Sequence, residues 1–73
     1  MEDELFATDT HMARIEVRET DSGLFRGFVY IRRLEEGPDA EVLHQTVEDF
    51  PTREEAKEAA TYLATRTLRE LEF

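Results

Sequence analysis

The 73-residue chain has no cysteine and no tryptophan, and it has only three glycines and two prolines. The lack of cysteine excludes disulfides, thiolate metal sites and cysteine nucleophiles. The glycines are isolated from one another, so the sequence has no glycine-rich phosphate-binding loop. No apolar run approaches the roughly 20 residues of a membrane span, and residues 1–9 are acidic where a signal peptide would be basic. We therefore expect a cytoplasmic protein without membrane contacts.

The sequence has little that points to catalysis. A chain of this length makes one domain and buries only about 60% of its unfolded surface, which leaves no room for a deep cleft. Its two histidines, His11 and His44, lack metal-ligand spacing. The adjacent carboxylate pairs fall in expected loops or at a helix start, where no burial would raise a pKa. We expect no enzyme, no metal and no cofactor.

Acidic residues are plentiful, and they are segmental. The formal net charge is −9, and residues 35–55 hold eight acids against one arginine. Rows of carboxylates resemble the charge of phosphates, so we expect these acids to bind a basic surface of a partner protein, with complementary charge speeding the encounter. The competing interpretation is a solvated surface that only maintains solubility. The eight acids are Glu35, Glu36, Asp39, Glu41, Glu48, Asp49, Glu54 and Glu55.

The segment from Thr52 to Glu72 is organised as an amphipathic helix. Thr52 and Glu55 have the spacing of a capping box, which predicts a helix that begins near Arg53. Small and apolar residues then recur at three- and four-residue steps, the period of one helical face. The expected buried stripe consists of Ala56, Ala59, Ala60, Leu63, Ala64, Thr67 and Leu71.

Residues 13–34 read as a hairpin of two strands. Residues 13–18 alternate between apolar and charged side chains, and a turn that ends in Gly23 follows. A three-residue loop with a left-handed final residue would pair Thr20 with Leu24 and place Ile15 opposite Val29. A two-residue loop would shift the pairing by one residue.

A third strand is expected at residues 41–47, with Leu43 and Val47 inward and with Val42, His44 and Thr46 outward. The expected fold class is α+β, a three-stranded antiparallel meander with one C-terminal helix packed on one face (β-β-β-α). Residues 12–73 form this domain, and residues 1–11 form an acidic, flexible leader.

The sheet face away from the helix is the second candidate site. The hairpin register places Arg14, Arg18, Arg26, Phe28, Tyr30 and Arg32 on this open face, and the third strand adds His44. The aromatics can pair across strands, including a cation–π contact, form a homodimer or partner interface, or stack on single-stranded nucleic acid. The charge of −9 disfavours the last use.

The order of three strands and a Thr-capped helix that starts Thr52-Arg53-Glu54-Glu55-Ala56 resembles several small bacterial domains. They are the N-terminal domain of HicB-type antitoxins, the arm-type DNA-binding domains of phage-like tyrosine recombinases, and YegP-like domains. Resemblance to the arm-type domains implies a sheet placed in a DNA groove, with the open face toward DNA. The size and acidity are similar to those of phage-encoded inhibitors, including anti-CRISPR proteins and DNA mimics.

Taken together, these patterns predict a non-enzymatic, acidic protein-binding module. It would act as an inhibitor or adaptor on a basic surface of its partner, such as a surface built for nucleic acid, and a homodimer through the open face is also expected. The alternative is a nucleic-acid-binding or antitoxin-type module that uses the open face.

Overall fold

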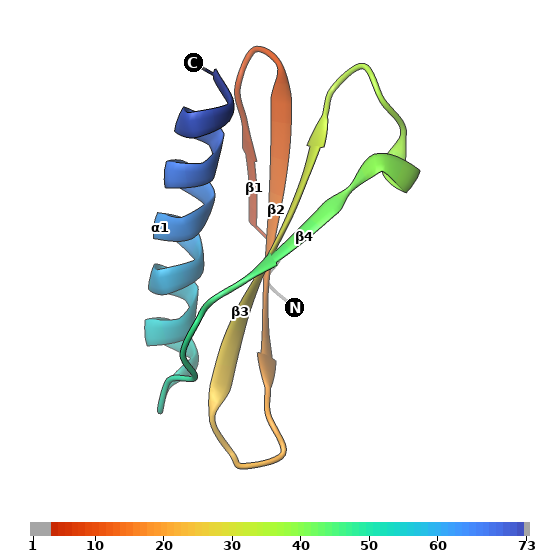
Figure 1. Ribbon diagram of the computed structural model, residues 1–73. Helices are drawn as coiled ribbons and strands as arrows, with labels where there is room; N and C mark the ends of the chain where they lie inside the picture. Colours follow the sequence, from red (N-terminus) through yellow and green to blue (C-terminus); the bar gives the residue numbers. More distant parts are fainter. Residues whose placement is uncertain (1–3, 73) are drawn as a thin grey trace.

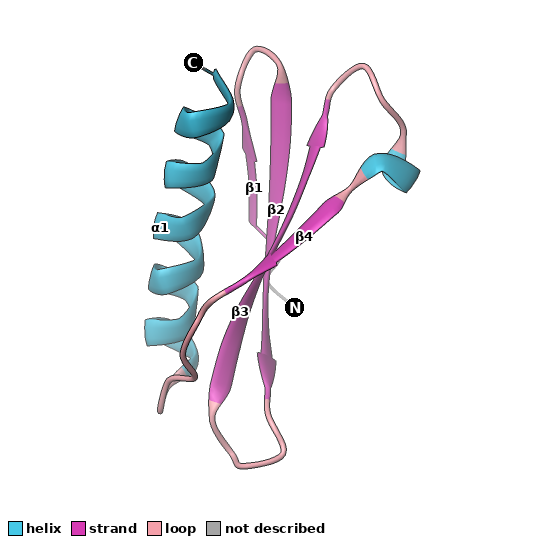
Figure 2. Ribbon diagram, viewed as in Figure 1, coloured by secondary structure: helices cyan, strands magenta, loops and turns pink. Residues whose placement is uncertain are grey.

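The computed structural model describes residues 4–72, which form a four-stranded antiparallel sheet with one long helix against one face (Figure 1; Figure 2). The expected α+β class, antiparallel sheet and C-terminal helix are confirmed, but the expected number of strands was wrong. In sheet order the strands are β1 (Glu4–Ala7), β2 (His11–Glu19), β3 (Phe25–Arg33) and β4 (Val42–Gln45), with a short 3-10 helix, η1 (Pro38–Ala40), before β4 and the helix α1 (Arg53–Glu72) last.

The additional strand, β1, lies in the segment expected to be a leader, of which residues 1–3 fall outside the described residues. Leu5 pairs with Arg14 and Phe6 with Ala13. Phe6 packs against the core, and Glu4 forms an ion pair with Lys57 of α1 at 2.6 Å. The four acids of residues 1–10 concealed this strand, because Phe6 and Glu4 are held by tertiary contacts with the core and with Lys57, which local propensity does not indicate.

The β2–β3 hairpin has the predicted three-residue loop. Gly23 has a φ of 80°, and the Thr20 amide donates to the Leu24 carbonyl at 2.7 Å. Ile15 consequently lies opposite Val29, and Ala13 lies opposite Ile31. The shifted register of a two-residue loop is therefore wrong, and the apolar residues of both strands share the face that α1 covers.

The helix α1 begins at Arg53, as the capping box predicts, and the Glu55 amide donates to Thr52 Oγ1 at 3.1 Å. Its buried residues recur every fourth position and are Ala56, Ala60, Ala64 and Leu68. The prediction was wrong at Leu71, which is 48% exposed, and it left out Leu68, which is buried. A four-residue step runs obliquely around a helix of 3.6 residues per turn, which suits a helix lying across a twisted sheet.

Small residues let the helix and the sheet approach closely. A Cβ atom placed on Gly27 would lie 2.7 Å from the Ala60 Cβ and 2.9 Å from the Ala56 carbonyl oxygen. Below this contact, Ile15 and Val29 are the largest fully buried side chains. On the covered face, the backbone of β3 therefore packs directly against the alanines of α1. The two branched side chains fill the core between the helix and the sheet.

The predicted orientation of the third strand, observed as β4, was wrong. His44 pairs with Val29 and Leu43 with Tyr30, so His44 lies on the helix side and Leu43 on the open face. Val47, expected inward, lies after the strand and is fully exposed. The helix packs on β2 and β3, which leaves both sides of β4 partly in solvent. Because neither side of β4 is fully buried, the alternation of apolar and polar residues along it does not predict its register.

Candidate protein-binding surfaces

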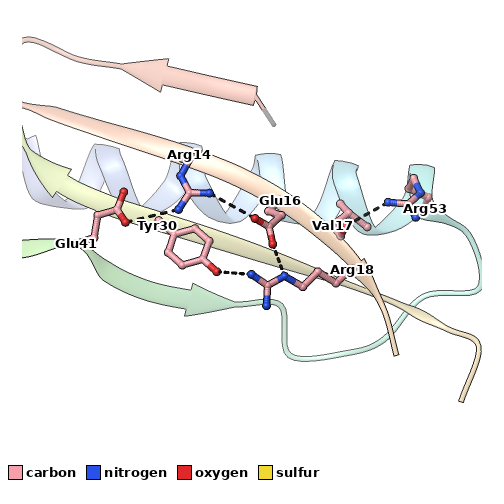
Figure 3. Close-up of polar contacts among 7 residues, drawn as sticks. All are labelled: Arg14, Glu16, Val17, Arg18, Tyr30, Glu41 and Arg53. Carbon is pink, nitrogen blue, oxygen red and sulfur yellow. Dashed lines mark hydrogen bonds and ion pairs between the residues drawn. The ribbon is translucent and has the colours of Figure 1, made fainter. Parts of the chain in front are cut away.

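The open face carries a network of charged and aromatic side chains from β2 and β3 (Figure 3). Glu16 lies between two arginines: Arg14 donates to it at 3.4 Å, and Arg18 donates to its other oxygen. The Arg14 guanidinium stacks 4.2 Å above the Tyr30 ring, and that of Arg18 lies 5.0 Å from the Phe28 ring centre. Arg18 also donates to the Tyr30 hydroxyl at 3.2 Å.

Acids from beyond the hairpin complete this network. Glu41, just before β4, pairs with Arg14 at 3.6 Å, and Asp49 accepts two hydrogen bonds from Arg26 at 2.6 and 3.0 Å. The hydrogen bond from Arg26 holds the pKa of the Asp49 carboxyl below its usual value, and the same bond raises the pKa of Arg26. The bidentate geometry fixes the segment after β4 against the hairpin.

The pairing of Arg18 with Arg26 across the two strands would be repulsive without partners. Glu16 engages Arg18, and Asp49 engages Arg26. Arg32, at the far end of β3, donates to the backbone carbonyl of Glu36 at 2.8 Å. The predicted open-face residues on β2 and β3 thus come together, His44 is absent from that face, and the arginines are occupied within the chain.

The predicted acidic residues divide between the two ends of β4. Two of the eight, Glu41 and Asp49, are half-buried and engaged by arginines. The other six are exposed. Within residues 4–72, Glu35 is the one of these six that forms an ion pair, a long one with Arg33 at 3.8 Å. One exposed group precedes β4, and the other lies at the junction and helix start; they are Glu35, Glu36 and Asp39, then Glu48, Glu54 and Glu55.

A hollow of about 370 Å³ lies on the helix side of β4, and no sequence pattern had predicted it. Its lining includes His11, Val42, His44 and Leu71. His11 is only 6% exposed, and its Nδ1 lies 2.7 Å from Thr10 Oγ1. The two histidines converge because both point to the helix side of their strands, which depends on the unpredicted register of β4.

A metal-binding cluster and a membrane-spanning helix are both absent from the part of the chain that the structure describes. Residues 4–72 bring no three His, Asp or Glu side chains together in an arrangement that would hold a metal ion. The single long helix among them is not apolar enough to span a membrane.

Comparison with protein-family models, curated proteins and solved structures gives no match for this chain. The geometry of its own residues therefore carries the functional argument.

Proposed function

We propose that the chain is a non-enzymatic protein-binding module, an inhibitor or adaptor, whose exposed acidic groups engage a basic surface of a partner protein. The observation that carries this proposal is that the arginines of the open face are bound within the chain, whereas most of the acids are exposed to solvent. Three of the four open-face arginines, Arg14, Arg18 and Arg26, are engaged by carboxylates of the same chain, and Arg32 donates to a backbone carbonyl. By contrast, six of the eight acids at the two ends of β4 are exposed. The surface charge left for a partner is negative.

The placement of these acids supports binding over simple solubility. The groups lie at opposite ends of one strand (Figure 1), and the six residues 42–47 between them carry no formal charge. A surface that only maintains solubility would not require the acids to lie in two separate groups. Two separated negative groups favour a partner with two matching basic patches and steer its approach at low ionic strength.

The same contacts weigh against the nucleic-acid alternative. A phosphate on the open face would have to displace Glu16 from Arg18 or Asp49 from Arg26. Displacement would leave a carboxylate beside the phosphate, in a protein whose net charge already repels a polyanion.

Affinity capture from a cell extract tests the proposal. The test variant carries Glu36→Gln, Asp39→Asn, Glu48→Gln and Glu54→Gln, which remove four charges from the two groups; a control variant with Asp9→Asn, Glu19→Gln, Glu58→Gln and Glu70→Gln removes four elsewhere. Asp49 is left intact because it binds Arg26. We expect wild type and control to recover the same basic proteins and the test variant to lose them. Equal recovery by all three would contradict the proposal.

Labelled oligonucleotides, single- and double-stranded, test the alternative by fluorescence anisotropy at low salt. We expect no binding by wild type. Binding that is lost in an Arg26→Gln, Arg32→Gln variant would instead assign function to the open face.

A further inference from the structure

The outer edge of β4 is a row of backbone groups with no neighbouring strand. β4 is the last strand in the sheet order of the described residues. The Thr46 amide donates to the Gly27 carbonyl at 3.0 Å, and the bonds of an antiparallel ladder alternate along each strand. Val42 and His44 therefore bond toward β3, and the amide and carbonyl groups of Leu43 and Gln45 point away from the sheet.

The strand at this edge is short, with four residues, but it lacks the other usual protections against pairing. Natural proteins shield edge strands with charged side chains, proline or very short strands. Residues 42–47, Val-Leu-His-Gln-Thr-Val, include no formal charge and no proline, and Val42 and Leu43 are 57% and 45% exposed. The opposite edge, β1, by contrast carries Glu4, which is tied to Lys57.

The acidic groups bracket this uncharged edge. Asp39 and Glu41 precede it, and Glu48 follows it. The intervening six residues span about 20 Å of extended chain. An extended segment lying along β4 would therefore meet backbone donors and acceptors in the middle and carboxylates at both ends.

We propose that β4 is a strand-addition site for an extended segment of a partner protein with an uncharged centre and lysine or arginine on both sides. The inference rests on the proposed function and specifies the form in which its partner binds. Backbone hydrogen bonds to Leu43 and Gln45 hold the segment, and the bracketing acids select its basic flanks.

The hollow beside β4 adds selection by side-chain size. Alternate side chains of an added strand point to the two faces of the sheet. Those on the helix side would point toward the hollow whose lining includes Val42, His44 and Leu71, and the apolar part of this lining favours an aliphatic side chain. Those on the open face would pass Leu43, which stands beside Tyr30.

Charge excludes a second copy of this chain as the occupant. Two copies paired antiparallel through β4, with Leu43 of one opposite Gln45 of the other, would place Glu41 of one copy opposite Val47 and next to Glu48 of the other. The acids at each end of one strand would then lie close to those of the second copy, and like charges on neighbouring strands are destabilising. A basic-flanked strand reverses the sign of every one of these contacts.

The probe is a fluorescein-labelled peptide, acetyl-Lys-Lys-Thr-Leu-Thr-Val-Thr-Lys-Lys-amide, titrated with the full chain by fluorescence anisotropy at low salt. Two control peptides isolate the two parts of the proposal. One is N-methylated at its five central residues, which removes the backbone donors and keeps the charge; the other has glutamate in place of lysine. We expect both controls to bind at least tenfold more weakly than the probe.

Matched proline variants test which edge is used. Gln45→Pro removes an outward amide from β4, a position where proline leaves the β3 ladder intact. Ala7→Pro makes the equivalent change on the outer edge of β1. We expect at least a tenfold loss of peptide affinity for Gln45→Pro and none for Ala7→Pro, with thermal unfolding confirming that both variants fold. Amide hydrogen exchange gives a second readout: the peptide should protect Leu43 and Gln45, whereas the inward amides of His44 and Thr46 are protected without it.

The outcomes separate this inference from the proposed function. If the N-methylated peptide binds as tightly as the probe and Gln45→Pro has no effect, the strand-addition site is wrong while charge-driven binding stands. If the probe does not bind, the site is also wrong, and the capture experiment alone decides the proposed function. A wild-type dimer that Gln45→Pro converts to a monomer would overturn the choice of occupant.

Discussion

The two faces of the hairpin β2–β3 are closed in different ways. On the covered face, Gly27 meets the alanines of α1, and Ile15 and Val29 are fully buried. On the open face, the same two strands are bridged by arginines, carboxylates and rings that remain partly in solvent. Burial stabilises in proportion to the apolar area removed from water, whereas exposed ion pairs contribute little. The covered face therefore contributes most of the stability, and the open face contributes less.

The sharpest test of this difference is Ile15→Ala on the covered face. Ile15 is 1% exposed, and truncating a buried isoleucine leaves a cavity that costs about 2–5 kcal/mol. We expect a loss of that size in the free energy of unfolding from urea denaturation. The control is Leu5→Ala, which truncates a side chain that is 63% exposed and should change stability by about 0.5 kcal/mol or less. Equal losses would show that the two faces do not differ.

The second prediction concerns the close contact of α1 with the sheet. Gly27→Ala would place its Cβ 2.7 Å from the Ala60 Cβ and 2.9 Å from the Ala56 carbonyl oxygen, so the helix must shift. Overpacking of this kind costs about 1–3 kcal/mol. Gly37→Ala is the matched control, because a Cβ there meets nothing within 4 Å. Thermal unfolding of the two variants checks the prediction, and a stabilised Gly27→Ala would refute the contact.

The contrast between the faces also explains what the sequence could predict. The hairpin register follows from loop length and Gly23, and the helix start follows from Thr52, because each is fixed by a few neighbouring residues. β1 has only four residues, and besides its pairing with β2 it is held by contacts of Phe6 with the core and of Glu4 with Lys57, which lie far away in the sequence. The register of β4 is set by the ladder after η1, with no tight turn to fix it.

The candidate sites show the same difference between features fixed by neighbouring residues and features that depend on the path of the chain. The open-face placement of the arginines and rings on β2 and β3 was predictable because they share the hairpin register, and so does Glu16, which engages Arg18. The internal use of Asp49 was not, since it depends on how the segment after β4 returns to the hairpin. The hollow and the free edge depend on the same path, and local patterns carry no information about it.

The third prediction weakens the open face alone. Glu16→Gln removes the charge between Arg14 and Arg18 while keeping the size of the side chain. We expect a loss of about 0.5–1 kcal/mol at low salt, because both arginines keep their rings and Arg14 keeps Glu41. The loss should shrink at 1 M salt, where screening acts within about 3 Å. Urea denaturation at two salt concentrations is the measurement, and a loss as large as that of Ile15→Ala would contradict the assignment.

The smallest expected effect is a dependence on pH at Asp49. The hydrogen bond from Arg26 lowers the pKa of Asp49 in the folded chain, so the pair stabilises the fold above the unfolded pKa of about 3.9. This contribution is lost as pH falls through the folded pKa, because the protonated carboxyl no longer pairs with Arg26. Wild type should therefore be more stable than Asp49→Asn at neutral pH, and the difference should narrow below about pH 4. Unfolding curves of both proteins between neutral and acidic pH measure it. A difference that stays constant with pH would mean that Asp49 holds the segment after β4 by its shape and not by its charge, and the open face would then have one electrostatic connection fewer to the edge where the partner is proposed to bind.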